Sequence, residues 1–429
     1  MKIRLRTRGS SQGARWVLLT LYYSMFSYVL VYTLGLPRSL LYIGDILTIW
    51  SFVLAFYKNS KRNFLIPSEF SLLVVFMLLG VFSAFVNSEP ILLVVWGLRN
   101  ILRYFLFLYS CYVLLEIQDI ENVLKFLWKI FWLSIPLCTV ERFFVHYPAG
   151  TIIGDMVGGV FWNYLGCNLP LNIILCICII DSARGFFADN IKLPRFVITC
   201  VMAMYMAATA ELKVFFVEFA VIIIVSAIVA RVKWNKVLVM IIGALFFSQV
   251  MSLFVTLNAS TSYDYSAIFS VNGFIEYATR QSGYNGTGDV NRLTGIAIIW
   301  KQLFEGNLEK CLFGIGLGNA EYTNFFASDF YLKYGYMNYQ WFHMIWMFIE
   351  NGLIGILIYI SFFIKTLKKS FAIRKEDEYA SIAAISIVIM LLLYIYNNSL
   401  RVEASGYLMF MILSVPYICL RDRKRRYER

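Results

Sequence analysis

Charged residues are scarce in this chain. Only 15% of its 429 residues are Asp, Glu, Lys or Arg, whereas 60% are hydrophobic and 17% are aromatic. Soluble domains contain about 25% charged residues. The composition therefore excludes an ordinary soluble domain and predicts a membrane protein that crosses the bilayer several times.

Histidine is almost absent, and the cysteines follow no metal-binding or disulfide pattern. The chain has 2 histidines, His146 and His343, and 8 cysteines that lie nearly all in apolar runs. Cys176 and Cys178 are two residues apart on an expected helix, so they point to different faces. These absences argue against a zinc site, a multi-histidine site and a disulfide framework, whereas an oxygen-ligand site for a hard cation stays open.

The net charge of +12 does not form a single basic surface. Its excess lies in short clusters beside the apolar runs, where Lys and Arg fix topology and contact anionic lipid headgroups. We therefore expect membrane lipids, and no nucleic acid, as partners.

Apolar windows of about 20 residues, the length that spans a bilayer, recur along the whole chain. They predict an all-α polytopic bundle of about twelve helices, forming one integral membrane domain over residues 1–429. The expected spans cover residues 16–34, 37–57, 67–86, 91–115, 124–145, 159–180, 196–212, 214–230, 237–257, 341–364, 379–397 and 403–420. Between the seventh and eighth spans, Glu211-Leu212-Lys213 indicates a tight hairpin or a broken helix.

Basic residues gather on alternate sides of these spans. The distribution predicts cytoplasmic N- and C-termini. The long polar segment 258–340, between the ninth and tenth spans, is then a large extracytoplasmic loop.

Two arginines interrupt the fourth span. Arg99 and Arg103 are four residues apart, so they project from one helix face near the middle of the bilayer. They either pair with carboxylates such as Glu141 or Glu211 and hold the bundle together, or form an anion site, since two guanidinium groups can bind a phosphate or diphosphate.

Other polar residues lie at the outer ends of spans or in the loop. Singly, Arg142, Lys213 and Arg401 are typical of anchors at the membrane interface, but together with the fourth span they would surround a cavity. In the loop, apolar spacing predicts an amphipathic helix over residues 291–304, with Asp289 as a candidate N-cap and Arg292 in its first turn.

A glycine-rich run follows that expected helix. Gly314-Ile315-Gly316-Leu317-Gly318 either lets backbone amides approach an oxyanion or lets the chain turn tightly, and we favour the turn.

The order of these features resembles the O-antigen ligase and polymerase superfamily. The resemblance depends on the Arg-bearing fourth span, on one large late loop, and on these loop and span residues: Arg292, Trp300, Leu312 to Asn319, and Glu350-Asn351-Gly352-Leu353-Ile354-Gly355. It implies a bacterial inner-membrane glycosyltransferase that acts outside the cytoplasm on glycans carried by undecaprenyl diphosphate. No cofactor and no metal are implied; a chain-length regulator and a flippase are implied as possible partners.

Two positions depart from the family pattern. Ligases carry a histidine at the spacing that Trp341 occupies here, and His343 lies two residues later, which turns a regular helix by about 200°. Glu211-Leu212-Lys213 replaces the family's Ser-Arg. Lys213 keeps the charge but not the two-pronged hydrogen bonding.

The reaction suggests roles for the polar residues. Arg99, Arg103 and Arg292 would stabilise the diphosphate leaving group, with weaker candidates in Arg142, Lys213, Arg280, Arg401, Gly314 and Gly316. His343 is the first candidate for the base, and Asp289, Glu211 and Glu350 follow it. For Glu350 we favour a structural role beside Gly352.

We therefore expect a polysaccharide polymerase that inverts the anomeric centre. A ligase that transfers the glycan to lipid A core is the nearest alternative. A lipid-linked oligosaccharide flippase or other transporter is the alternative from another class.

Overall fold

The computed structural model describes residues 10–62, 66–230, 288–322 and 327–427, with isolated positions between 236 and 283. Its regular structure is helical throughout these residues, apart from one isolated bridge between Tyr322 and Ala327. Nine of the described helices are long and apolar enough to cross a membrane. Two shorter apolar helices have 17 residues each. The nine long apolar helices confirm the helical membrane architecture. The total of twelve spans stays a prediction.

The apolar helices overlap the expected spans, most of them to within a few residues. They are α1 (Gln12–Tyr28) continued by η1 (Val29–Thr33), η2 (Arg38–Tyr42) continued by α2 (Ile43–Arg62), α3 (Phe70–Val86), α4 (Ile91–Leu114), α5 (Ile117–Phe143), α6 (Asn168–Phe187), α7 (Leu193–Thr209), α8 (Lys213–Ala230), α15 (His343–Ile373), α16 (Glu378–Tyr396) and α17 (Glu403–Tyr427). Most of the expected ninth span, 237–257, and most of the loop from 258 to 287 lie outside the described residues.

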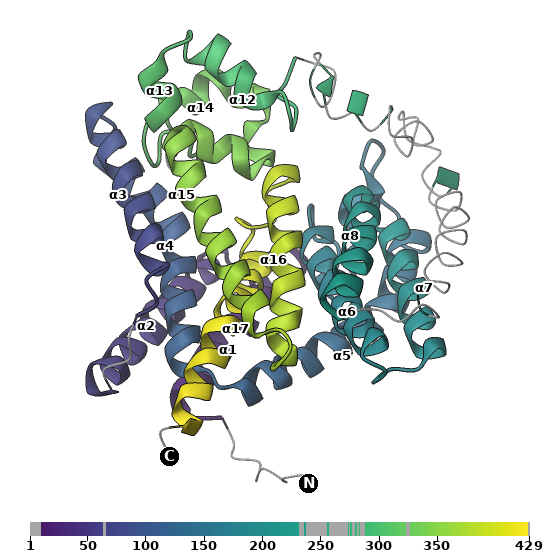
Figure 1. The fold of residues 1–429 in the computed structure, drawn as a ribbon. Coiled ribbons are helices and arrows are strands. Elements are labelled where there is room, and N and C mark those ends of the chain that lie inside the picture. The colour runs from purple at the N-terminus through teal and green to yellow at the C-terminus, as the bar shows by residue number, and fades with distance from the viewer. Residues whose placement is uncertain are drawn as a thin grey trace.

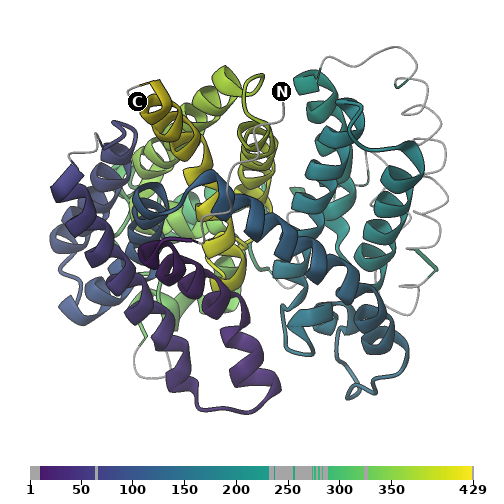
Figure 2. The same ribbon diagram turned by 90° about the horizontal axis from the view of Figure 1, so that it is seen from below.

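The helices form two groups. Helices α1 to α4 pack with α15, α16 and α17, whereas α6, α7 and α8 form a second group against α16, with α5 running between them (Figures 1 and 2). Helix α17 is central, because 94% of its apolar window is buried, compared with 22% for the window of η2 and α2. Because α17 is central, its residues contact α1, α4, α15 and α16.

A cap of short helices covers one end of the first group. It comprises residues 288–322 and 327–342, with α12 (Gly295–Ile298), η5 (Ile299–Leu303), α13 (Leu308–Phe313), α14 (Asp329–Tyr334), η6 (Gly335–Met337) and η7 (Tyr339–Trp341). The cap lies over the first turns of α15, at the end of the bundle opposite the end of α17 (Figure 1).

Two local expectations are corrected. Helix α6 begins at Asn168 rather than residue 159, because Glu141 accepts hydrogen bonds from the amides of Gly158 and Gly159 and holds that stretch in tight turns. The amphipathic helix begins at Gly295 rather than residue 291.

Residues preceding that short helix are also placed differently from the expectation. Its N-cap is Thr294, not Asp289, and Arg292 precedes the helix. The α7–α8 connection is the tight hairpin, with Glu211 in the left-handed region at φ 54°.

Candidate functional site

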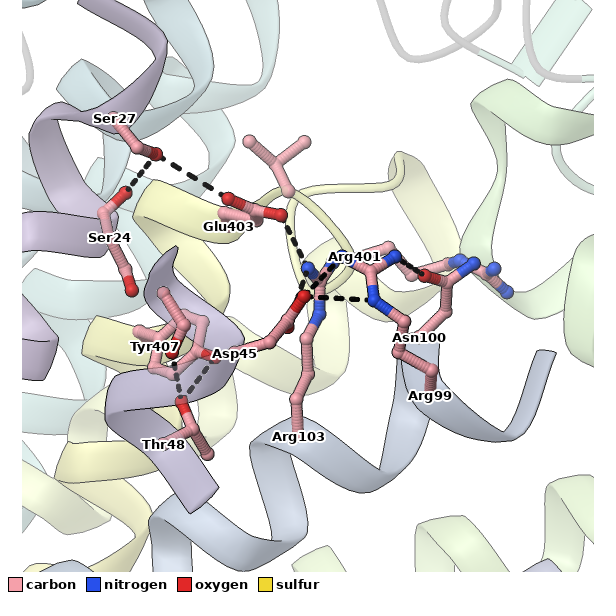
Figure 3. Close-up of polar contacts among 12 residues, drawn as sticks. Ser24, Ser27, Asp45, Thr48, Arg99, Asn100, Arg103, Arg401, Glu403 and Tyr407 are labelled. Carbon is pink, nitrogen blue, oxygen red and sulfur yellow. Dashed lines mark hydrogen bonds and ion pairs between the residues drawn. The ribbon is translucent and has the colours of Figure 1, made fainter. Parts of the chain in front are cut away.

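Arg99 and Arg103 of α4 lie against two carboxylates from distant helices (Figure 3). The Nε of Arg99 donates to Asp45 of α2 at 2.9 Å, and Arg103 donates to Glu403 at the start of α17. The Nη1 of Arg103 also lies 3.8 Å from Asp45. We call Asp45, Arg99, Arg103 and Glu403 the Arg103 cluster; its two positive and two negative charges balance.

Carboxylate pairing was one of the two sequence interpretations, but its partners are different. Glu141 instead accepts from the backbone amides of Gly158, Gly159 and Asn163, at 2.7 to 3.1 Å. Glu211 lies 3.4 Å from Lys213. The expected partners therefore lie at turns: Glu141 bonds the turns before α6, and Glu211 lies in the α7–α8 hairpin.

One end of the Arg103 cluster is open. The side chain of Arg99 is 24% exposed, compared with 10% for Arg103. Its guanidinium carbon lies 4.4 Å from the ring centroid of Trp96 and 5.1 Å from that of Tyr42. Arg99 is therefore the most exposed member of the cluster, beside aromatic rings of the kind found at membrane interfaces.

A second set of charges lies next to the first. Arg401, just before α17, donates to Glu321 of the cap at 2.6 Å, and its Nη1 lies 3.9 Å from Glu350 of α15. Its guanidinium carbon is 3.7 Å from the ring centroid of Trp346. With His343, these residues form what we call the Arg401 cluster.

Tyr104 connects the two clusters. Its hydroxyl donates to the carbonyl oxygen of Arg401 at 2.7 Å and accepts from Arg103 at 3.2 Å. In Figure 3 the side chains of Arg99 and Arg103 point towards Asp45. The structure thus brings three of the arginines singled out in the sequence to one region.

His343 is the first residue of α15 and is buried. His343, Trp346 and Glu350 are spaced three and four residues apart, so they follow one another along one face of that helix. The imidazole ring packs between Tyr394 and Tyr359, with centroids 5.1 and 5.8 Å away.

Both ring nitrogens of His343 are buried and have no hydrogen-bond partner among the described residues. Trp346 hydrogen-bonds the side chain of Glu350, whose Oε2 faces Nη1 of Arg401 at 3.9 Å. Buried polar atoms are bonded in most native proteins, because each unbonded one costs about 1 to 3 kcal/mol. The imidazole of His343 is thus the buried polar group of this cluster that is left for another partner.

The chain before His343 is irregular. Asn338 is left-handed at φ 56°, and Phe342 is extended between η7 and α15. The 200° helical rotation that separates Trp341 from His343 in a regular helix therefore does not apply here. His343 is buried, whereas Trp341 is 39% exposed.

The glycine run supports Glu350. The amides of Gly316 and Gly318 donate to the backbone carbonyl and side chain of Glu350, at 2.9 and 3.1 Å, and the amide of Gly314 donates to Lys310. These amides are therefore engaged inside the protein, in the tight turn that we favoured. Gly352 interrupts α15 at φ 62°, which lets the run approach the helix backbone.

Arg292 lies at the junction of the cap with α15 and α16. It is buried, its Nε donates to the carbonyl oxygen of Tyr396 at 3.0 Å, and its guanidinium lies 4.1 Å from that ring. It also lies 5.3 Å from the ring of Phe342, the residue before His343. Arg292 is thus near the Arg401 cluster.

Three weaker candidates lie elsewhere. Arg142 is in the last turn of α5, Lys213 begins α8 beside Glu211, and Arg280 is exposed. Sequence reasoning missed Asp45, Glu321, Trp346 and Glu403. Asp45 and Glu403 carried a usable signal, since a lone carboxylate near the end of an apolar span calls for a partner.

Neither protein-family models, nor curated proteins, nor solved structures match this chain.

Proposed function

We propose that this protein is a polysaccharide polymerase of the O-antigen or capsule type. It transfers a glycan from undecaprenyl diphosphate to a lipid-linked acceptor. The observation that carries the proposal is the grouping of Arg99, Arg103 and Arg401 within the membrane domain, beside a buried His343. The resemblance of the loop and span motifs supports the same reaction.

The arginines suit a diphosphate leaving group. The open end at Arg99 admits a headgroup from the membrane surface, and Asp45, which contacts both arginines, is the carboxylate that a diphosphate would replace. Guanidinium groups that already face the leaving group stabilise its developing charge, and one such donor lowers a barrier by about 3 kcal/mol. Arg292 and Arg401 extend this positive charge towards the cap.

The transfer is a direct displacement at the anomeric carbon. The acceptor hydroxyl oxygen forms a bond to the anomeric carbon, and the bond from that carbon to the diphosphate oxygen breaks, with its electron pair leaving on the diphosphate. The anomeric centre is inverted. The hydroxyl proton passes to His343, whose ring nitrogens have no other partner among the described residues.

The topology belongs to the same proposal. We place the protein in the bacterial cytoplasmic membrane with about twelve spans, both termini in the cytoplasm, and the cap outside. A flippase that supplies the donor and a regulator of chain length are the expected partners.

Reconstitution tests the proposal. Purified protein in lipid vesicles, given undecaprenyl-diphosphate-linked repeat units, should produce a ladder of products. Arg103→Lys and His343→Ala should abolish the ladder, whereas His146→Ala, which changes the exposed second histidine, should not. The rivals give other results: one transfer to lipid A core would establish a ligase, and translocation without elongation would establish a transporter.

A further inference from the structure

A separate cleft with a volume of about 650 Å³ opens at the cap. Pockets for organic ligands have volumes of about 300 to 1,000 Å³. The cleft is bounded by the η5–α13 turn, by α14 and by Asn87 at the end of α3. Its size therefore fits a small saccharide.

The lining has the mixed chemistry that saccharides need. Two cations, Lys310 and Lys333, are balanced by two carboxylates, Glu305 and Asp329, so the cleft does not favour an anion. Tyr334 also lines the cleft; its ring centroid lies 5.0 Å from that of Phe330 and 5.0 Å from Nζ of Lys333. Aromatic rings stack on the C–H faces of sugars. Amide and charged side chains form hydrogen bonds with sugar hydroxyl groups, which both donate and accept.

One short segment separates the cleft from the Arg401 cluster. Ile315 and Asn319 line the cleft, whereas Gly318 and Glu321 of the same segment bond Glu350 and Arg401. The cleft therefore lies one chain segment away from the Arg401 cluster.

The turn that borders the cleft has left-handed backbone at two successive residues. Glu305 has a left-handed φ of 53°, and Gly306 follows it at 73°. A non-glycine residue in this region costs about 1 kcal/mol or more, and such strain gathers at functional sites. Asn307 then caps α13, with its side-chain oxygen accepting from the amide of Lys310 at 3.0 Å.

We propose that this cleft binds the saccharide chain of the lipid-linked glycan, away from the reacting sugar. The inference rests on the proposed function for its ligand class. Tyr334 supplies the stacking surface, and Lys333 supplies hydrogen bonds to hydroxyl groups.

A binding measurement with free saccharide tests the cleft by itself. The probe is the repeat-unit oligosaccharide that mild acid releases from the host's lipid-linked glycans, which carries neither lipid nor diphosphate. Calorimetry on the full chain in detergent should show saturable binding. Tyr334→Ala should weaken it about tenfold, in line with the loss of a stacked ring, while Tyr334→Phe keeps it.

Matched variants separate binding from folding. Tyr336→Ala removes a tyrosine that is 70% exposed on the same cap and does not line the cleft. This variant should bind the oligosaccharide as tightly as the unmodified protein does. Lys333→Gln changes an exposed side chain and should weaken binding even where Tyr334→Ala fails to fold.

The outcomes distinguish the two proposals. Absent binding, or equal binding by the cleft variants and Tyr336→Ala, overturns the saccharide cleft even where the ladder forms. Binding that depends on Tyr334 without any elongation supports the cleft and overturns the polymerase.

Discussion

Asp45 holds the balance of charge in the Arg103 cluster, and Asp45→Asn should strengthen diphosphate binding while lowering stability. The substitution keeps the size of the side chain but leaves one excess positive charge on Arg99 and Arg103. At a separation of about 6 Å and an effective dielectric constant of about 20, one unit charge attracts another with about 2.8 kcal/mol.

Solvent reduces this energy. The side chains of Arg99 and Asp45 are 24% and 17% exposed, so we halve it to about 1.4 kcal/mol, or about tenfold in affinity. Stability should fall by about 1 to 3 kcal/mol, because Arg99 loses a charged hydrogen-bond partner. The two readouts thus move in opposite directions.

The assay is calorimetric titration of the detergent-solubilised protein with farnesyl diphosphate, a short polyprenyl diphosphate. Asp181→Asn is the matched control: Asp181 is 16% exposed and lies 3.7 Å from Arg184, in the second group of helices. Unchanged or weaker binding by Asp45→Asn, or an equal gain in Asp181→Asn, would refute the reasoning.

Three further predictions concern stability, measured by denaturant titration in detergent. Arg103→Met should cost about 3 to 5 kcal/mol, whereas the double variant with Glu403→Leu should recover most of that loss, because a buried charge is no longer left alone; no recovery would contradict it. Gly316→Ala should cost more than Gly35→Ala: both have positive φ, but a methyl group at Gly316 would lie 2.2 Å from a backbone atom of α3, and at Gly35 it meets open space. Glu218→Gln should change the free energy of unfolding by no more than about 1 kcal/mol, because this buried carboxyl group has no ion pair within the described part of the chain. Glu218→Ala should lower it by about 2 to 4 kcal/mol. A large loss in the Gln variant would count against this view.

Membrane helices were predictable because their limits depend on local apolar length. Helix α4 was expected over 91–115 and covers Ile91–Leu114, and α16 was expected over 379–397 and covers Glu378–Tyr396. The start of α6 was missed because residues 159–167 are apolar enough for a span. A carboxylate from α5, Glu141, holds them in turns instead.

The site was predictable only in part. Two arginines on one face of α4 indicated that polar groups must lie opposite them. The sequence did not show which carboxylates pair with them. The partners are 54 and 300 residues away, in α2 and α17. The expected partner Glu141 is sequestered by backbone amides, which no spacing in the sequence indicates.

The sequence by itself determined that the chain is a helical membrane protein and which of its residues are costly to bury. Those properties are local, because each span must satisfy its own backbone and each intramembrane charge has its own desolvation cost. The tertiary structure alone decided that Asp45 and Glu403 neutralise α4, that Tyr104 joins Arg103 to Arg401, and that a polar cleft lies one segment away. Those properties depend on which helix faces meet, and contacts across hundreds of residues are made only when the bundle is assembled.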